Sequence, residues 1–153
     1  VLPHPPRDTR TFDTEKGKAI FTVSPTEVLH LPEGRLLLQT MRSHDQFNTT
    51  IYSYNDRYRG VYNDRMVVFM NSDDLADRGV KAGERIALET ISADGVKRRV
   101  DGLTALDYPM PRGAVAGYYP ELNPLLPLDY YDRISGTPAA KSIPVRVVMT
   151  AST

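Results

Sequence analysis

The sequence of 153 residues contains no cysteine. Disulfides, cysteine nucleophiles and cysteine-ligated zinc or iron–sulfur sites are therefore excluded within this segment. Histidine is also scarce: His4, His30 and His44 lie far apart, and no two of them have the helical spacing that metal sites use. We therefore expect no metal site formed by this chain.

The chain also has no net charge and no long apolar run. The 19 basic and 19 acidic residues cancel, so no overall field attracts the chain to nucleic acid or to an anionic membrane. No apolar run approaches the roughly 20 residues that a membrane-spanning helix needs. A glycine-rich phosphate loop of the Walker or Rossmann type is also absent. We expect neither nucleic acid nor membrane as a partner, and we expect a cytoplasmic location.

The composition is that of one globular domain. Hydrophobic residues make up 41% and charged residues 25% of the chain, which is typical of soluble folds, and the length suffices to bury a core without cross-links. Residues 1–14 are rich in proline and polar side chains and are predicted to be an extended linker, with the domain at 15–153. Such a start indicates a domain cut from a longer protein; a processed small protein is the alternative.

The stretch Met66–Leu88 organises the predicted fold. Met66–Met70 is an apolar run of strand length, too short for an ordinary buried helix. Asn71 and Ser72 are candidate N-caps of a short helix, and the carboxylates that follow them suit the positive end of its dipole. Gly79 comes just past that helix, where a left-handed cap needs no Cβ. The stretch predicts a buried strand, a short capped helix, a tight turn and a second strand.

Strand patterns recur along the rest of the chain, which predicts a mainly β fold of roughly six or seven strands and one or two short helices. Closure of these strands into a barrel would leave no exposed sheet edge. Residues 51–62 and 120–140 are predicted to be long loops. The further predicted strands are Lys18–Val23, Arg35–Met41, Val96–Leu106, Ala114–Tyr118 and Ile143–Thr150.

A dense polar segment, residues 42–50, follows a predicted buried strand, where side chains can converge on a ligand. A pyrophosphate needs hydroxyl, amide and cationic donors, and a guanine edge needs a carboxylate that accepts its N–H groups. Asp45 is the candidate for a base. The alternative is a solvated loop whose polar side chains cap their own backbone. The candidates for phosphate and ribose are Arg42, Ser43, His44, Gln46 and Thr49.

Three motifs then follow in order: LLLQTMRSHDQFNTT, NSDDLADRGVKAGERIAL, and LNP with TPAAK after it. In this order and spacing the chain resembles the C-terminal dinucleotide-binding domain of the molybdopterin oxidoreductases, in particular their formate-dehydrogenase-like branch. The resemblance covers residues 34–149. The middle motif alone is common to many barrels of this kind, so the order of all three carries the resemblance. It implies a six-stranded double-psi β-barrel.

The resemblance also implies a cofactor, bis-molybdopterin guanine dinucleotide holding molybdenum or tungsten, whose guanine dinucleotide tails such a domain covers. Asn123 and Lys141 match a late Asn and a late Lys that lie near the cofactor in the family. The alternative is that Asn123 only starts an Asn-Pro turn and that Lys141 is a surface charge. The cofactor-binding residues predicted in this way are Arg42, Ser43, His44, Asp45, Gln46, Asn48, Thr49, Tyr119, Asn123 and Lys141.

The leading hypothesis is therefore the cofactor-binding domain of a molybdenum- or tungsten-dependent oxidoreductase resembling formate dehydrogenase. No catalytic residue is predicted here, and the domain alone should be inactive, because the family's metal ligand and any iron–sulfur cluster lie upstream. Its partners would be the upstream domains of the same polypeptide and the small-molecule substrate of the parent enzyme. The alternative is a non-catalytic double-psi module that binds a protein through its tyrosine-rich loop, residues 52–62.

Overall fold

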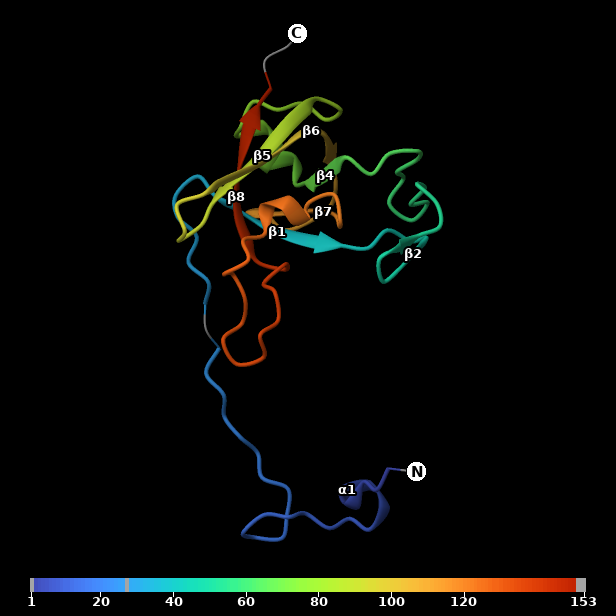
Figure 1. Cartoon of the computed structure of the whole chain (residues 1–153), viewed down its shortest axis with the longest axis vertical. Helices are drawn as coiled ribbons and strands as arrows, with labels where there is room; N and C mark the ends of the chain where they lie inside the picture. Colours follow the sequence, from blue (N-terminus) through green and yellow to red (C-terminus); the bar gives the residue numbers. More distant parts are fainter. Residues whose placement is uncertain (1, 27, 151–153) are drawn as a thin grey trace. The chain divides into compact units, whose positions relative to one another are not determined.

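In the computed structural model, which describes residues 2–26 and 28–150, six strands close into a barrel (Figure 1). In spatial order they are β1 (Leu36–Met41), β7 (Ala114–Tyr118), β4 (Val67–Met70), β6 (Lys97–Asp107), β5 (Arg85–Ile91) and β8 (Ile143–Met149). β1 pairs parallel with β7 and β4 pairs parallel with β6, whereas the other four pairs are antiparallel. The predicted mainly β fold with a six-stranded barrel is confirmed.

The barrel interior is filled by apolar side chains that alternate along the strands. In β1, Leu36 and Leu38 point into the core while Leu37 between them is more exposed. Ile86 and Leu88 of β5 also pack into the core, and Ala87 between them is buried as well. A fully buried side chain of this size stabilises the fold by about 1.5–3 kcal/mol. The alternation in the sequence therefore identifies the buried face of β1, whereas β4 is buried along its whole length.

The predicted strand–helix–turn unit is also confirmed. After β4, Asn71 caps the helix α2 (Ser72–Ala76) by accepting a hydrogen bond from the backbone N–H of Asp73 at 2.9 Å. Gly79 has a φ of 64°, the left-handed conformation that favours glycine. The N–H of Val80 then bonds the carbonyl of Leu75 at 3.0 Å. This closes the helix and turns the chain toward β5.

Two short elements flank the barrel. A hairpin of β2 (Gln46–Phe47) and β3 (Thr50–Ile51) forms a separate two-stranded sheet and opens the long loop that reaches to residue 64. Figure 1 shows β2 in a lobe beside the barrel strands. The 3₁₀ turn η1 (Asn123–Leu125) follows β7 and packs Leu125 into the core. None of the helices in the described ranges has the length and apolarity required to cross a membrane.

The chain divides into two units, Val1–His30 and Leu31–Thr153, and two predictions for the first unit are wrong. Pro5–Asp8 is a helical turn, α1, instead of extended chain, because His4 Nδ1 accepts the N–H of Arg7 at 3.2 Å and so caps it. Lys18–Val23 forms no strand. Its β-prone residues have no neighbouring strand with which to pair among the described residues, and Phe21 is fully exposed at 100%.

A carboxylate lies buried among cations on the outer face of the barrel. Glu89 of β5 is 1% exposed and receives Lys97 Nζ at 2.8 Å, Arg99 Nη1 at 2.7 Å and Arg146 Nη2 at 2.6 Å. The hydrogen bond from Lys97, aided by those from Arg146 and Arg99, outweighs the opposing effect of burial and lowers the pKa of Glu89 from 4.5 to about 2. These pairs join β5 to both of its neighbours, β6 and β8.

Glu89→Gln should therefore lower the free energy of unfolding at neutral pH by about 2 kcal/mol, because it removes charge-assisted hydrogen bonds. The folded-state pKa is depressed, so this stabilisation is present above pH 4.5 and is lost as the pH falls toward 2. Urea unfolding of both proteins across that range checks the prediction. Glu33→Gln, at an exposed position, is the control. A wild-type minus Glu89→Gln difference that does not shrink on acidification would contradict it.

Candidate functional site

The carboxyl ends of two parallel strands meet at one end of the barrel. Met41 at the end of β1 is paired with Tyr118 at the end of β7, so the residues that follow, Arg42 and Tyr119, emerge side by side. The loop before β8 packs against the same place, because Ala140 accepts hydrogen bonds from the N–H and the hydroxyl of Thr40, both at 3.0 Å. Residues distant in sequence are thereby brought to one edge.

An open groove of about 900 Å³ lies at this edge. It carries three cationic side chains, those of Arg42, Arg59 and Lys141, and no carboxylate is among its lining residues. Arg42 and Lys141 form no ion pair within the described part of the chain. A chain with no net charge thus presents a locally positive groove. Its lining residues are Thr40, Met41, Arg42, Arg59, Tyr119, Asn123, Thr137, Pro138, Ala140 and Lys141.

Hydrogen bonds hold the groove's polar side chains in place. The Lys141 ammonium donates to the carbonyl of Thr40. Arg42 donates from Nε to the Tyr119 hydroxyl at 3.4 Å and from Nη2 to Asn48 Oδ1 at 3.2 Å. The Tyr119 hydroxyl in turn donates to the Asn48 carbonyl. Each of these cations is bonded through only part of its donors, so further N–H groups remain to bind an anion.

A buried carboxylate orients the third cation of the groove. Asp56 is 1% exposed, and its Oδ2 accepts hydrogen bonds from Arg59 Nη1 at 2.6 Å and from the Tyr118 hydroxyl at 2.9 Å. Burial would raise the pKa of Asp56, but the bonds from Arg59 and Tyr118 together outweigh it and hold the pKa below its usual range. Burial and the adjacent Asp56 raise the pKa of the Tyr118 hydroxyl, which stays protonated.

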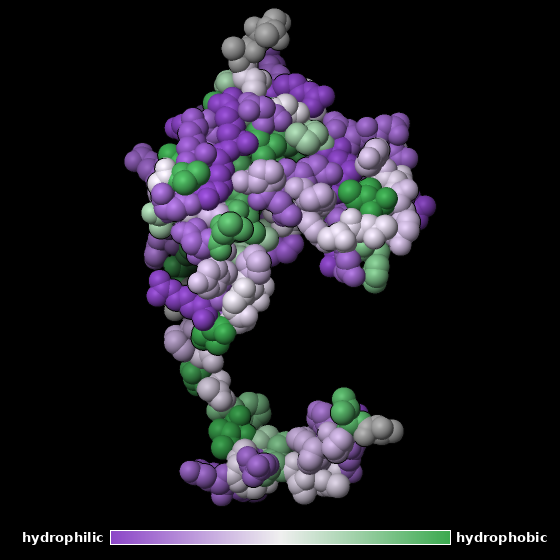
Figure 2. All heavy atoms as spheres, in the orientation of Figure 1, coloured by the Kyte–Doolittle hydropathy of each residue, from purple (hydrophilic) through white to green (hydrophobic). Residues whose placement is uncertain are grey.

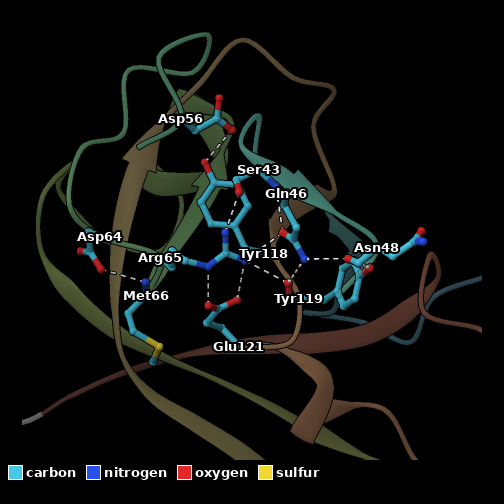
Figure 3. A network of polar contacts seen from close by, with 10 residues as sticks. All are labelled: Ser43, Gln46, Asn48, Asp56, Asp64, Arg65, Met66, Tyr118, Tyr119 and Glu121. Carbon is cyan, nitrogen blue, oxygen red and sulfur yellow. Dashed lines mark hydrogen bonds and ion pairs between the residues drawn. The ribbon is translucent and has the colours of Figure 1, made fainter. Parts of the chain in front are cut away.

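Beneath the groove, the guanidinium of Arg65 joins three segments of the chain (Figure 3). It is 5% exposed and forms an ion pair with Glu121, with Nε to Oε1 at 2.5 Å and Nη2 to Oε2 at 3.0 Å. It also donates to two side chains of the polar segment, from Nη1 to Ser43 Oγ at 2.6 Å and from Nη2 to Gln46 Oε1 at 3.0 Å. We call these four side chains the Arg65 network.

The Arg65 network also fixes the backbone at the groove. The carbonyl of Tyr119 accepts from Arg65 Nη2 and from Gln46 Nε2, each at 3.0 Å. Gln46 Nε2 also donates to the carbonyl of Asn48 at 3.1 Å. Figure 3 shows these bonds converging between β2 and the turn after β7. Two of the segments that contribute to the groove, the polar segment and the turn at Tyr119, are therefore held together by one buried cation.

The ten residues predicted to bind a cofactor fall into three places. Arg42, Tyr119, Asn123 and Lys141 line the groove, Asn48 borders it through its bonds to Arg42 and Tyr119, and Ser43 and Gln46 lie in the Arg65 network. His44, Asp45 and Thr49 lie in the lobe beside it. There His44 packs edge-on against Tyr58 with ring centroids 4.2 Å apart, and its Nε2 lies 3.8 Å from Asp45 Oδ1.

Sequence reasoning missed Arg65, Glu121, Arg59 and Thr40. Arg65 stands directly before the apolar run of β4, and a charge at the start of a fully buried strand must find a partner. That was the available signal, but nothing in the sequence points from Arg65 to Glu121, which lies 56 residues further along. Arg59 lies within the loop 52–62, which was predicted only as a protein-contact surface, yet it pairs with Asp56 and lines the groove.

The sequence of this chain is similar to a known domain family and to several longer proteins. The sequence profile of the family described as "Molydopterin dinucleotide binding domain" matches residues 36–144. An uncharacterized oxidoreductase of Mycobacterium tuberculosis is 50% identical over 154 aligned positions that cover 98% of this chain and 20% of that protein. Protein YdeP of Escherichia coli is 44% identical, over 90% of this chain and 19% of its own length. The chain thus spans about a fifth of the length of these relatives.

Among solved structures, the acetylene hydratase from Pelobacter acetylenicus has a similar fold. The TM-score is 0.52 and the sequence identity is 17%, with 77% of this chain and 19% of that chain covered. At such low identity the likeness concerns the fold, and the matched part is again a minor portion of a longer protein.

Arg65→Met should lower the free energy of unfolding by about 3–5 kcal/mol, because it leaves the Glu121 carboxylate without its buried partner. The double variant Arg65→Met/Glu121→Met removes both charges and should regain part of this loss. Arg57→Met, which removes an exposed guanidinium, should cost under about 1 kcal/mol and is the matched control. Denaturant unfolding measures all three. Equal costs for Arg65→Met and Arg57→Met would show that the Arg65 network does not carry this part of the fold.

Proposed function

Since the chain belongs to the molydopterin dinucleotide binding domain family, we propose that its groove holds the dinucleotide end of a molybdopterin cofactor in a larger oxidoreductase. The observation that carries this proposal is the positive groove at the ends of β1 and β7, which has three cationic side chains and no carboxylate in its lining. A pyrophosphate is a compact anion, and guanidinium and ammonium groups are its strongest protein donors.

The donor set fits the phosphate part of such a cofactor. Arg42 and Lys141 would bind phosphate oxygens, and the side-chain amide of Asn123 and the hydroxyl of Thr137 would bind ribose or phosphate. The groove volume of about 900 Å³ lies within the range of pockets that take ligands of this size. Ser43 and Gln46 act indirectly in this proposal, because their polar atoms already serve the Arg65 network.

For the base we propose guanine, bound through Asp45 in the lobe next to the groove. A guanine edge presents two adjacent N–H donors, and a carboxylate offers two acceptors for them. Asp45 is half-buried, and its backbone is anchored because its carbonyl accepts the N–H of Tyr52 at 2.9 Å. His44 and Thr49 would complete the contacts from the same segment.

We further propose that the parent enzyme resembles formate dehydrogenase and carries bis-molybdopterin guanine dinucleotide with molybdenum or tungsten. The bound cofactor would supply the redox chemistry, and any iron–sulfur cluster would lie upstream. The residues of this chain bind and orient the cofactor's tail, and no catalytic group is assigned to them. The relative from M. tuberculosis supports this proposal, because it is described as an oxidoreductase and this chain covers only a fifth of its length.

A tyrosine-rich surface supports a contact with the upstream domains of the same polypeptide. Tyr52, Tyr54, Tyr58 and Tyr62 are each 61–73% exposed on the lobe that follows β3. Tyrosine is enriched at protein interfaces because one end is apolar and the other hydrogen-bonds. The same surface is the observation that favours the alternative, a non-catalytic module that binds a protein partner. The cofactor-binding proposal requires the cationic groove for function, whereas the protein-binding alternative does not.

Arg42→Gln/Lys141→Gln in the full-length protein should lower retained cofactor at least about tenfold, because each charge-assisted hydrogen bond contributes about 1.5–3 kcal/mol. Metal content by mass spectrometry and guanine nucleotide released by acid measure this. Lys16→Gln/Lys81→Gln makes the same change in net charge at two exposed positions and serves as the control. If both double variants retain cofactor equally, the groove is not the phosphate site.

A second pair of variants tests the base and ribose contacts. Asp45→Ala/Asn123→Ala should also lower cofactor retention in the full-length protein, with the fold intact, because both residues are surface-accessible and neither belongs to the Arg65 network. Circular dichroism checks the fold and metal analysis checks retention. Unchanged molybdenum or tungsten content in this variant would remove Asp45 and Asn123 from the site.

A further inference from the structure

A short apolar segment in the first unit pairs with no strand among residues 2–26 and 28–150. Residues 19–23 read AIFTV, and the side chains of Phe21 and Val23 are 100% and 95% exposed. In an extended chain, alternate residues share one face, so Ala19, Phe21 and Val23 would form a continuous apolar face. Figure 2 shows hydrophobic side chains, in green, on the surface of this unit. Exposure of an apolar face of this kind in water is unfavourable and marks an interaction surface.

The main-chain polar groups of this segment also lack hydrogen-bond partners among the described residues. Within the described ranges, the N–H and carbonyl groups of residues 19–23 form no hydrogen bond with the protein. The preceding turn, in contrast, is closed by hydrogen bonds. The Thr14 hydroxyl donates to the Lys18 carbonyl at 2.8 Å and accepts the Lys18 N–H at 3.2 Å. The N–H of Gly17 bonds the Thr14 carbonyl at 2.9 Å. The turn therefore presents an extended segment whose own donors and acceptors are free.

The barrel of this chain cannot supply the missing partner strand, because its six strands form a closed ring from β1 through β8 and back to β1. The separate β2–β3 sheet has strands of only 2 residues, too short to pair with the whole segment. A strand is added to a sheet only at an open edge, where main-chain groups are free. β-branched and aromatic residues make up most of AIFTV, and such residues favour a pleated surface buried on one side. The segment thus has the composition and free backbone of a strand whose sheet lies elsewhere.

We propose that residues 19–23 form an added strand at the edge of a sheet in the remainder of a longer polypeptide, with Ala19, Phe21 and Val23 packed against that sheet's apolar face. This inference depends on the proposed function only in taking the chain as part of a longer protein. The M. tuberculosis relative aligns over 98% of this chain, a stretch that includes the segment, and this chain covers only 20% of it. The segment would then tie the cofactor-binding domain to the body of the enzyme.

Amide hydrogen exchange in the full-length protein tests the proposal. The amides of residues 19–23 that pair with the sheet should exchange at least a hundredfold more slowly than their intrinsic peptide rates, alternating along the segment because an edge strand is paired on one side only. Phe21→Asp should abolish this protection, since its side chain would enter the apolar interface. Thr22→Asp, one residue along and on the opposite face, should preserve it.

Exchange at intrinsic rates throughout the segment would overturn the proposal. Protection that disappears on dilution would also overturn it, because it would assign the partner strand to a second copy. Metal and nucleotide content measured on the same samples keeps the two proposals separate. If the protein lacked cofactor but its amides were protected, the proposed cofactor-binding function would be wrong and the proposal of an added strand would stand.

Discussion

The candidate site depends on the ion pair and the hydrogen bonds that the buried guanidinium of Arg65 forms. Arg65 lies at the start of β4, yet its partners come from the polar segment after β1 and from the turn after β7. A cation taken out of water is stable only when it is paired and hydrogen-bonded, and here the Glu121 carboxylate, two further side chains and a backbone carbonyl accept its hydrogen bonds. The parallel pairing of β1 and β7 brings these segments together, and Arg65 fixes their spacing.

Pairing of charges elsewhere explains how a neutral chain carries a positive groove. Several carboxylates are already held by cations: Glu89 by Lys97, Arg99 and Arg146, Asp56 by Arg59, and Glu121 by Arg65. Arg42 and Lys141 have no such partner in the described ranges and both line the groove. The net charge of a chain thus says little about a site, because the local balance depends on which charges have been paired by the fold.

Local sequence patterns predicted most of the barrel strands and the helix α2. The contacts between segments distant in the sequence could not be predicted from these patterns. The cap at Asn71, the glycine at Gly79 and the alternation in β1 each have a local physical cause, so the elements were predicted correctly. Lys18–Val23 failed because strand propensity needs a partner, and none lies in the described chain. The polar segment was predicted to bind a ligand, but its division between groove, buried network and lobe follows from tertiary contacts such as Arg65 with Ser43.

The direct test of the central claim is the composition of the full-length protein as isolated. Its metal content and the nucleotide released by acid hydrolysis should be measured on the same sample. The account predicts molybdenum or tungsten together with guanine nucleotide, because the positive groove at the strand ends is the proposed site for the pyrophosphate of the cofactor's dinucleotide tail. A native protein free of both metal and nucleotide would contradict it and would leave a protein-binding module with an exposed tyrosine-rich face.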